Sequence, residues 1–411
     1  MVGRSLDHTS SLAREHDVPY ATSSLDDVLT RNDVDIVSIV TPPKTHLPYS
    51  EKVLAAGKHV LCEKPFTMDR SEAQQLVAAH EAACTKHNRR IIAMIDHELR
   101  FHSSVRDVKA FISSGAFGKI RKASLYFLSP MPAPMQTDWS WWHDETQFGG
   151  VLGAIGSHFV DLISFVTSTE VVKVQGDCQT LIKEKCDASV EPSLTDGTFP
   201  MKPVTSDDST EYRALHRSNK NSSRPSFRSP SSSPSTSSSS SAVVESQEFF
   251  CTTTLCSAAM GVKRNEMILL SDKGSIVMDM STMTATFQPA DYSRPMGDTS
   301  QQKVWKSDAP SEVKGMAIVS PYAFATVLLG RRLIQAIEQV KNNTSDSSLS
   351  ASASSSSSPS PSPSSHLTSL PGSLSGIGAT FSDGSYCMAV LDAVRESSKS
   401  NGEWIDCKYQ P

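Results

Sequence analysis

Two side chains, a lysine and a histidine, have the types and surroundings expected of acid–base chemistry. Lys64 follows a short apolar run, residues 60–62, and precedes Pro65, which cannot donate a hydrogen bond to a sheet and so ends the strand. Ligands of parallel α/β sheets lie beyond the carboxyl ends of the strands, so we expect the Lys64 ammonium to face a bound molecule. His158 follows a glycine-rich stretch, residues 149–156. A histidine, with a free pKa of about 6.5, can accept a proton near neutral pH.

Each of these side chains also has a structural interpretation. Lys64 can be a solvated lysine of a turn, and His158 can be a buried, hydrogen-bonded histidine beside glycines. Asp161, one turn after His158, either belongs to the site or caps and bridges neighbouring elements. Arg100 can either contact a cofactor or pair across a domain interface, and we favour the interface. The tryptophans within residues 139–142 either wall a substrate pocket or pack at a domain junction.

The composition predicts a two-domain intracellular protein. The chain has 411 residues and a formal net charge of −5, which predicts two domains and gives no basic footprint for nucleic acid. Its 8 cysteines form no Cys-x-x-Cys pair and no Cys/His group with zinc spacing, which predicts reduced thiols, no metal site and a cytoplasmic location. The first residues lack the apolar core of a secretory signal. The longest apolar window, 151–166, is too short for a membrane helix, so no membrane contact is expected.

The first part of the chain alternates strand and helix. Residues 34–40 form a near-continuous apolar run that is typical of a strand covered on both sides, and residues 60–62 and 91–95 form two more apolar runs. Helical patterns separate these runs at the spacing of βαβ units. Residues 20–96 therefore predict a parallel sheet of the doubly wound, Rossmann type, which we assign to a first domain, residues 1–96.

The pattern changes in the second part, residues 97–411. A helical segment is expected at 105–114 and another leads from the glycine-rich stretch to about residue 166. The remaining apolar runs are longer and follow one another without helices between them. They predict an α+β domain with an open antiparallel sheet and a few helices on one face. The expected strands are 119–128, 170–184, 209–217, 246–257, 265–270 and 274–279.

Two segments, residues 218–242 and 342–375, are rich in serine and proline. They contain too few apolar residues to offset the entropy of ordering them, so we expect them to be disordered. The first falls between two expected strands and the second between two expected helices. Both are therefore insertions at loop tips, where insertions are tolerated best.

Several motifs of the chain lie together in its first half. They are residues 34–43, 57–60 and 63–65, Arg100 and Phe101, and Gly149, Gly150, Gly156 and His158. The Glu-Lys-Pro motif is specific because a Gly-Lys-His-Val strand precedes it. Together these motifs resemble those of the Gfo/Idh/MocA oxidoreductases. Finer matches resemble the animal glucose-fructose oxidoreductase domain-containing proteins. They lie at residues 3–5, 161–162, 205–208, 379–381 and 402–404.

The resemblance implies hydride transfer between NAD(P) and a sugar or polyol. Carried over by position, Lys64 would bind the reacting hydroxyl, His158 would move the proton and Glu63 would lie near the nicotinamide ribose. The residues implied to line the cofactor crevice are Thr41, Pro42 and His46. The chemistry agrees, because alcohol oxidation releases a proton that a histidine can accept and creates alkoxide charge that an ammonium stabilises.

The start of the chain departs from the family pattern. No Gly-x-Gly-x-x-Gly stretch precedes Gly3, so we expect the first strand, the phosphate-binding loop and its helix to be missing, and we interpret the start as truncated or misannotated. The family also places an acidic residue after its second strand to bind the adenosine ribose. Arg4 and Ser5 occupy that region here, which favours a 2′-phosphate and hence NADP over NAD, unless Arg4 is an ordinary surface arginine.

A second departure affects the histidine. The family commonly has an acidic residue four positions before it, where it can orient the imidazole from the next helical turn. In this chain that position is Ala154. Asp161 is the carboxylate that can substitute, and we include it as a third candidate catalytic residue beside Lys64 and His158.

Two functions from different classes therefore remain. The leading hypothesis is an oxidoreductase that uses NADP or NAD on a small, sugar-like alcohol. The alternative is a non-catalytic nucleotide-binding or scaffold member of the family, which Ala154 and the missing phosphate loop favour. The intact Glu63-Lys64-Pro65 motif favours the enzyme. We also consider a homodimer.

Overall fold

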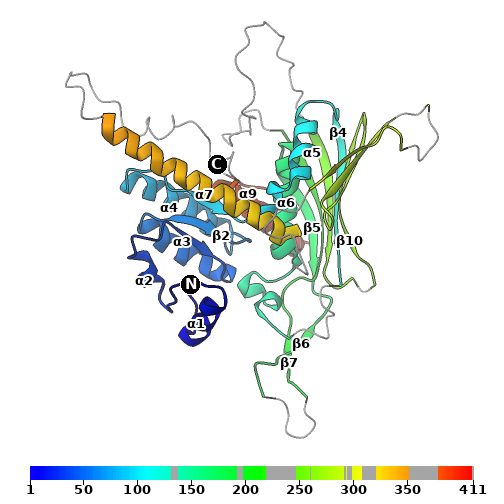
Figure 1. Ribbon diagram of the computed structural model, residues 1–411. Coiled ribbons are helices and arrows are strands. Elements are labelled where there is room, and N and C mark those ends of the chain that lie inside the picture. Colours follow the sequence, from blue (N-terminus) through cyan, green and yellow to red (C-terminus); the bar gives the residue numbers. More distant parts are fainter. Residues whose placement is uncertain are drawn as a thin grey trace.

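The computed structural model describes the chain in two main sheets with helices packed between and around them (Figure 1). The described residues are 1–130, 138–191, 198–218, 247–259, 261–290, 293, 299–307, 321–350 and 378–409. The predicted insertion at 218–242 lies outside them apart from its first residue. Helix α7 (Pro321–Ser350) continues through the first nine residues of the other serine-rich segment, 342–350, and the rest of that segment lies outside the described residues.

The smaller sheet has the parallel core that the sequence predicts. Its order is β1 (Ile36–Ile39), β2 (His59–Cys62), β3 (Ala93–Ile95) and β14 (Ala379–Thr380). The first three strands are parallel, and their register places Ile39, Cys62 and Ile95 side by side. The carboxyl ends of these strands therefore meet at one edge of the sheet. The fourth strand is antiparallel and belongs to the end of the chain, which the strand–helix pattern did not predict.

Local signals in the sequence begin and end the helices around this sheet. These helices are α1 (Leu6–Glu15), α2 (Leu25–Leu29), α3 (His46–Ala55) and α4 (Arg70–Lys86). Asp69 caps α4, because its Oδ1 accepts a hydrogen bond from the backbone N–H of Glu72 at 2.8 Å. Gly57 follows α3 with φ +75°, a conformation that glycine adopts without strain.

Two apolar layers cover the sheet. On one side, Val60 and Cys62 pack with α3, α4 and α9 (Phe381–Lys399) in the main core. On the other side, Leu61 and Met94 pack against α7 through a second cluster that includes Leu329 and Leu333. This alternation follows the period of two residues of a strand.

The prediction that residues 34–40 are covered on both sides was wrong. Ile36 and Val37 are half-buried, Ser38 is exposed and Val40 is 72% exposed. The reason is topological, because β1 is the edge strand of the described sheet and only β2 pairs with it. An apolar run does not distinguish a central strand from an edge strand.

The larger sheet has nine strands in the order β13-β12-β11-β10-β4-β9-β8-β5-β15. It is antiparallel, as predicted, except that β4 pairs with β9 in parallel. Helix α5 (Ser103–Ser113) packs on β12 and β13, α9 packs on β5, and α6 (Ser157–Thr167) contacts both helices. The strand bounds are β4 Ile120–Leu128, β5 Glu170–Gln179, β8 Ser209–Arg217, β9 Glu248–Cys256, β10 Arg264–Ser271, β11 Gly274–Asp279, β12 Thr284–Pro289, β13 Lys303–Lys306 and β15 Ile405–Asp406; a separate hairpin joins β6 (Glu184–Cys186) to β7 (Met201–Pro203).

One stretch among the described residues, Glu145–Thr167, is long and apolar enough to cross a membrane. Within its most apolar window, 94% is buried inside the protein. Its final part is α6, which is packed between α5 and α9 at the centre of the fold. Burial of this kind is what a core helix shows.

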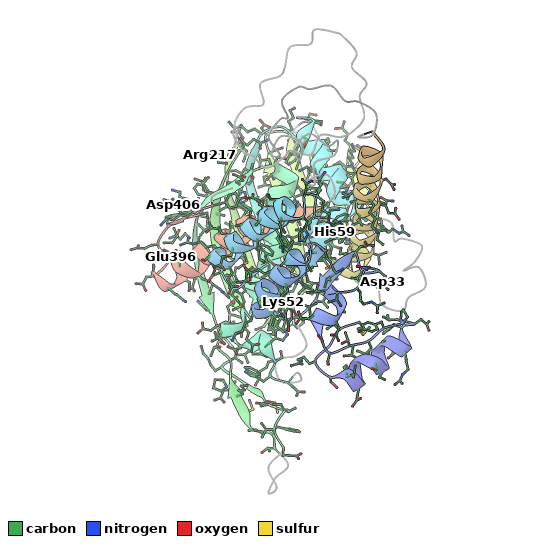
Figure 2. All side chains as sticks on the ribbon, turned by 90° about the vertical axis from the view of Figure 1, so that its left-hand side faces the viewer. Asp33, Lys52, His59, Arg217, Glu396 and Asp406 are labelled. Atoms are coloured by element: carbon green, nitrogen blue, oxygen red, sulfur yellow. The ribbon has the colours of Figure 1, made fainter. Side chains whose placement is uncertain are left out.

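Charged side chains lie on the outer surface of both parts. Figure 2 labels Asp33 and Lys52 beside the N-terminal part and Arg217 and Asp406 beside the large sheet. Lys52 forms an ion pair with Asp26, with Nζ and Oδ1 3.1 Å apart and both side chains mostly exposed. Such exposed pairs contribute little to stability.

Candidate active site

The candidate site is built from the residues that follow the three parallel strands. Thr41 follows β1, Lys64 follows β2 and Asp96 follows β3. Backbone hydrogen bonds continue one step beyond the strands, since the N–H of Glu63 donates to the carbonyl of Ile39 and the N–H of Asp96 donates to the carbonyl of Cys62, both at 2.9 Å. The sequence prediction that Lys64 lies at the carboxyl edge therefore agrees with the geometry.

Lys64 reaches from the parallel sheet to the second part of the chain. Its Nζ donates to the carbonyl oxygen of Ala154 at 3.0 Å, and its backbone N–H donates to Oε2 of Glu63 at 3.1 Å. The Lys64–Pro65 peptide bond is cis. The Lys64 ammonium is therefore held beside the start of the helix that carries His158.

The glycine-rich stretch sets the position of that helix. Gly150 has φ +104°, and a Cβ there would lie 2.1 Å from Oδ1 of Asp207, so only glycine fits. The other carboxylate oxygen of Asp207 accepts from the backbone N–H of Leu152 at 2.8 Å. This contact begins a π-helical turn, η5 (Leu152–Gly156), which runs directly into α6. Widened turns of this kind are frequent at functional sites.

His158 lies in the first turn of α6 and is 3% exposed. Its Nδ1 is 3.7 Å from Oε2 of Glu98, and its ring centroid is 6.1 Å from that of His97. Burial lowers the pKa of His158 well below its usual value, and the charges of Lys64 and His97 lower it further. The imidazole is therefore neutral at physiological pH and close enough to Lys64 to respond to its charge.

Two buried acids accompany the lysine and the histidine. Asp96 follows β3 directly, and Glu98 begins the 3₁₀ turn η2 (Glu98–Phe101). Burial and, after it, the neighbouring Glu63 raise the pKa of Asp96 to about 7, and Lys64 opposes the rise. Burial likewise raises the pKa of Glu98 well above its usual value, with Asp96 adding to the effect.

Asp96 and Glu98 were not among the candidate residues predicted from the sequence. The signal that could have found them is the one that selected Lys64, because both acids follow a buried parallel strand at its carboxyl end. The polar residues after strand 91–95 indicate the ligand-binding edge of the sheet, as the lysine after strand 60–62 does. Acidic side chains gathered at such an edge, with shifted pKa values, are typical of functional sites.

Asp161 is engaged by an arginine. Both of its carboxylate oxygens accept from Arg100, with Nε to Oδ2 at 2.8 Å. Arg100 also contacts Asp383 of α9, with Nη2 and Oδ1 3.2 Å apart. Burial alone would lower the pKa of Arg100, but Asp161 and Asp383 raise it above its usual value. Arg100 thus joins η2, α6 and α9, as the interface interpretation of the sequence proposed.

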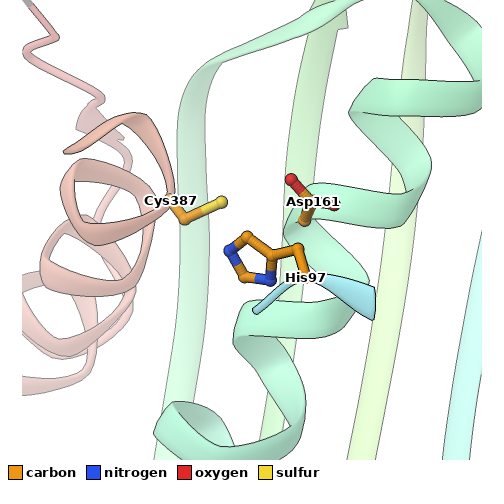
Figure 3. Close-up of side chains that lie close together, drawn as sticks. All are labelled: His97, Asp161 and Cys387. Carbon is orange, nitrogen blue, oxygen red and sulfur yellow. The ribbon is translucent and has the colours of Figure 1, made fainter. Parts of the chain in front are cut away.

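The fold also brings together three side chains that could ligate a metal (Figure 3). His97, Asp161 and Cys387 come from three different elements, and one ligand atom from each lies within 4.8 Å of the others. All three are buried. The guanidinium of Arg100 on Asp161 neutralises that carboxylate and would repel a cation. Sequence spacing could not have revealed this group.

The residues expected to line the cofactor crevice have different environments. Thr41 is exposed, and Pro42 is half-buried at the start of the short turn η1 (Pro43–Thr45). His46 is wholly buried, with Nδ1 3.0 Å from the carbonyl of Pro65 and Nε2 2.7 Å from the carbonyl of Thr41. His46 therefore ties the loop after β1 to the turn after Lys64.

Arg4 and Ser5 lie at the beginning of α1, and both are exposed. Ser5 is the N-cap residue, and its Oγ accepts from the backbone N–H of His8 at 3.4 Å. A short parallel bridge joins Val2 to Thr22 beside them. The end of a helix with free N–H groups next to an arginine suits an anionic group.

Two family descriptions match the chain in succession. Residues 2–91 match the oxidoreductase family with an NAD-binding Rossmann fold, and residues 105–214 match the GFO/IDH/MocA C-terminal domain. Over these two stretches the chain belongs to the Gfo/Idh/MocA oxidoreductase family. The matched residues of this Gfo/Idh/MocA protein include β1 and β2 of the parallel sheet and β4 and β5 of the large sheet.

Named relatives agree with the family. Glucose-fructose oxidoreductase domain-containing protein 1 of Xenopus tropicalis is 23% identical over 98% of this chain and 84% of its own length. The mouse protein of the same name is 28% identical over 52% of this chain and 50% of its own length. The match thus spans about half of the mouse relative.

Solved structures share the Gfo/Idh/MocA fold. An oxidoreductase domain protein from Kribbella flavida superimposes with a TM-score of 0.70 at 22% identity. The match covers 99% of this chain and 89% of the Kribbella chain. Levoglucosan dehydrogenase in complex with NADH and levoglucosan has a TM-score of 0.66 at 18% identity, with coverage of 99% and 89%. At these identities the likeness establishes the fold.

The tryptophan-rich loop of this Gfo/Idh/MocA protein makes packing contacts. Nε1 of Trp139 donates to the carbonyl of Pro203 at 2.9 Å, and the ammonium of Lys202 lies over its ring. The rings of Trp141 and Trp142 are 6.2 Å apart. These contacts join the loop to β7, in line with the packing interpretation.

Proposed function

We propose that this protein transfers a hydride between NAD(P) and an alcohol group of a sugar or polyol. The observation that carries the proposal is the meeting of Lys64 and His158 from separate parts of the chain. Lys64 Nζ is bound to the carbonyl of Ala154, one turn before His158, and its charge contributes to the lowered pKa of that histidine. A fixed ammonium beside a neutral imidazole suits a reaction that creates alkoxide charge and releases a proton.

The residues around this pair fit a nicotinamide cofactor. Val40 is 72% exposed at the carboxyl end of β1, next to the exposed Thr41, and an apolar side chain there can pack on a flat ring. Glu63 can accept hydrogen bonds from ribose hydroxyls. When bound, the nicotinamide supplies the hydride acceptor or donor. Arg4 at the start of α1 supports NADP as the preferred form.

The proposal assigns separate tasks to the candidate residues. Lys64 binds the reacting oxygen and stabilises its charge, and His158 holds the proton. Asp161, which sequence analysis offered as a catalytic residue, is proposed instead to fix Arg100 at the junction, because both of its carboxylate oxygens are engaged there. His46 keeps the loops that carry Thr41 and Lys64 in register.

The acids suggest a substrate with several hydroxyl groups. Within the described part of the chain, Oδ1 of Asp96 is buried and accepts no hydrogen bond. Glu63 and Asp96 offer acceptors on the same edge as Lys64, and a sugar or polyol offers the matching donors. The fold neighbour solved with NADH and levoglucosan is an enzyme of this substrate class by its name.

The first experiment combines cofactor binding with turnover. NADH and NADPH are titrated by fluorescence, and initial rates are measured on a panel of polyols and anhydrosugars. We expect micromolar binding, tighter for NADPH, and turnover of at least one polyhydroxy substrate. Lys64→Met should lower kcat by about 100-fold or more and leave cofactor binding and the melting temperature near wild type.

Lys122→Met is the matched control, since Lys122 is an exposed residue of β4. It should leave every measurement unchanged. Cofactor binding without turnover on any substrate, or equal kcat values for Lys64→Met and the wild type, would overturn the enzyme assignment and favour a non-catalytic binding role.

A further inference from the structure

Glu98 is a buried acid that lies close to the imidazole of His158. It is 3% exposed at the beginning of η2, directly after the third parallel strand. Its Oε2 lies 3.7 Å from Nδ1 of His158, and η2 packs against α6. Glu98 belongs to the turn that follows the parallel sheet and His158 to helix α6, so their approach depends on how these two elements pack.

The charges around the pair locate its proton. Asp96 and Glu63 face Glu98 and raise its pKa beyond the effect of burial, while Lys64 lowers it. Lys64 and His97 face His158, and both add to the effect of burial in lowering the pKa of the imidazole. At rest a proton shared by the pair therefore lies on the carboxyl group, and a doubly protonated imidazole is disfavoured.

Other charged side chains near η2 make contacts of their own, and burial and the nearby Arg332 of α7 lower the pKa of Arg106. Asp161 of α6 and Asp383 of α9 are bound to Arg100. Arg106 of α5 donates to the carbonyl of Arg100 at 3.0 Å. Helix α7 meets η2 through apolar side chains. Among these groups, Glu98 is the carboxylate that faces His158.

We propose, on the basis of the proposed function, that Glu98 and His158 form a relay that holds one proton and exchanges it with the substrate oxygen through Nε2 of His158. Glu98 acts through the histidine and is thus a positioning and relay residue. Position 154 presents only a backbone carbonyl to Lys64, so η2 supplies the acid that the turn η5 before α6 lacks.

Protons and electrons are conserved when the relay operates in oxidation and in reduction. In oxidation, the substrate O–H bond breaks and its proton binds Nε2 of His158, while the proton on Nδ1 passes to the Glu98 carboxylate. A nicotinamide, when bound, would supply the acceptor for the hydride that leaves the substrate carbon as the carbonyl forms. The pair ends with a neutral Glu98 and a neutral His158, so no imidazolium is left beside the Lys64 ammonium. Reduction is the reverse.

This relay predicts opposite pH dependences for the two directions. Oxidation needs ionised Glu98, so its kcat should rise with pH through the raised pKa of Glu98. Reduction needs the protonated acid, so its kcat should fall over the same range. Lys64, Asp96, Glu63 and His97 set where that range lies, because they are the charged groups that face the pair.

Glu98→Gln removes the proton site while keeping the shape of the side chain. We expect kcat to fall by about 100-fold, within the usual range for acid–base residues, with KM changed by less than about 3-fold and the pH dependence flattened. Glu98→Asp should recover part of the rate and keep the pH dependence. Glu51→Gln, an exposed carboxylate on α3, should match the wild type.

A readout independent of turnover separates the relay from the enzyme assignment. Infrared spectra at pH 6 should show a protonated buried carboxyl band in the wild type and in Glu51→Gln, reduced in Glu98→Gln. Equal spectra, or a Glu98→Gln enzyme with wild-type kcat and pH profile, would overturn the relay and leave the enzyme assignment in place. If Glu98→Gln does not fold, Glu98→Asp with a flat pH profile gives the same refutation. Absence of turnover in the wild type instead refutes the proposed function, whatever the spectra show.

Discussion

At the residue scale, the site is a group of ionisable side chains that burial keeps close to neutral. Lys64 brings one positive charge to an edge where Glu63, Asp96 and Glu98 bring up to three negative ones. Water would separate and screen these charges, but Asp96 and Glu98 are 5% and 3% exposed. Each buried acid therefore holds its proton to higher pH than it would in an unfolded chain.

Asp96→Asn tests whether the folded protein raises the pKa of Asp96. The folded pKa of Asp96, about 7, lies above its ordinary value of 3.8, so its contribution to stability is fully present below 3.8 and is lost as pH rises to about 7. Asparagine mimics the protonated form. We expect the variant to gain stability relative to the wild type between about pH 4 and about pH 7, measured by urea unfolding.

The matched control for that measurement is Asp107→Asn, which changes an exposed carboxylate on α5. Its free energy of unfolding should follow the wild-type curve at every pH. A parallel curve for Asp96→Asn as well would show that Asp96 ionises normally in the folded protein.

At the scale of elements, α9 and β14 decide how the C-terminal chain meets the parallel sheet. Thr380 caps α9 through a hydrogen bond from the backbone N–H of Asp383, and β14 pairs with β3 immediately before it. The helix then packs closely, since a Cβ at Gly384 would lie 1.8 Å from Cδ1 of Ile95 and 2.8 Å from Phe66. The third strand is therefore covered by chain nearly three hundred residues later.

Two glycine-to-alanine substitutions in helices compare the effect of close packing at Gly384 with the gain in helix propensity at Gly330. Gly384→Ala should lower the free energy of unfolding by about 1–3 kcal/mol, because the added methyl overpacks the buried contact with Ile95 and Phe66. Gly330→Ala on α7 adds a methyl to open space and should raise it by about 0.5–1 kcal/mol. Urea unfolding measures both changes in the free energy of unfolding. If both substitutions raise it, or both lower it, the close packing of α9 at Gly384 is contradicted.

At the scale of the whole molecule, Arg100 links the two sheets. It connects η2 at the edge of the parallel sheet with Asp161 on α6 and Asp383 on α9. The same docking brings His158 to Lys64 and Glu98. The ion pair and the candidate active site therefore depend on one arrangement of the two parts.

Removing Arg100 should leave the buried Asp161 and the partly buried Asp383 without this counter-charge. We expect Arg100→Met to lower the free energy of unfolding by about 3–5 kcal/mol. Adding Asp161→Asn removes one of the orphaned charges, so the double variant should lose less than the sum of the two single variants. A double-mutant cycle by urea unfolding measures the coupling, and additive losses would show that the pair is not formed.

The local content of the sequence was enough for the parallel strands β1 to β3 and for one side of the site. Apolar runs bounded by Gly and Pro predicted the parallel strands, and the rule for carboxyl ends placed Lys64 at the ligand edge. Gly150 marked a turn that only glycine can adopt. These predictions succeed because strand period and turn chemistry act over a few residues.

The other side of the site was decided by tertiary structure. The approach of Glu98 to His158, the pairing of Asp161 with Arg100 and the return of α9 to the third strand join residues that are far apart in the chain. Likewise, the apolar run before Val40 could not reveal that its strand lies at a sheet edge. Periodicity reports which face of an element is buried, whereas the partner that buries it follows only from how the elements pack together.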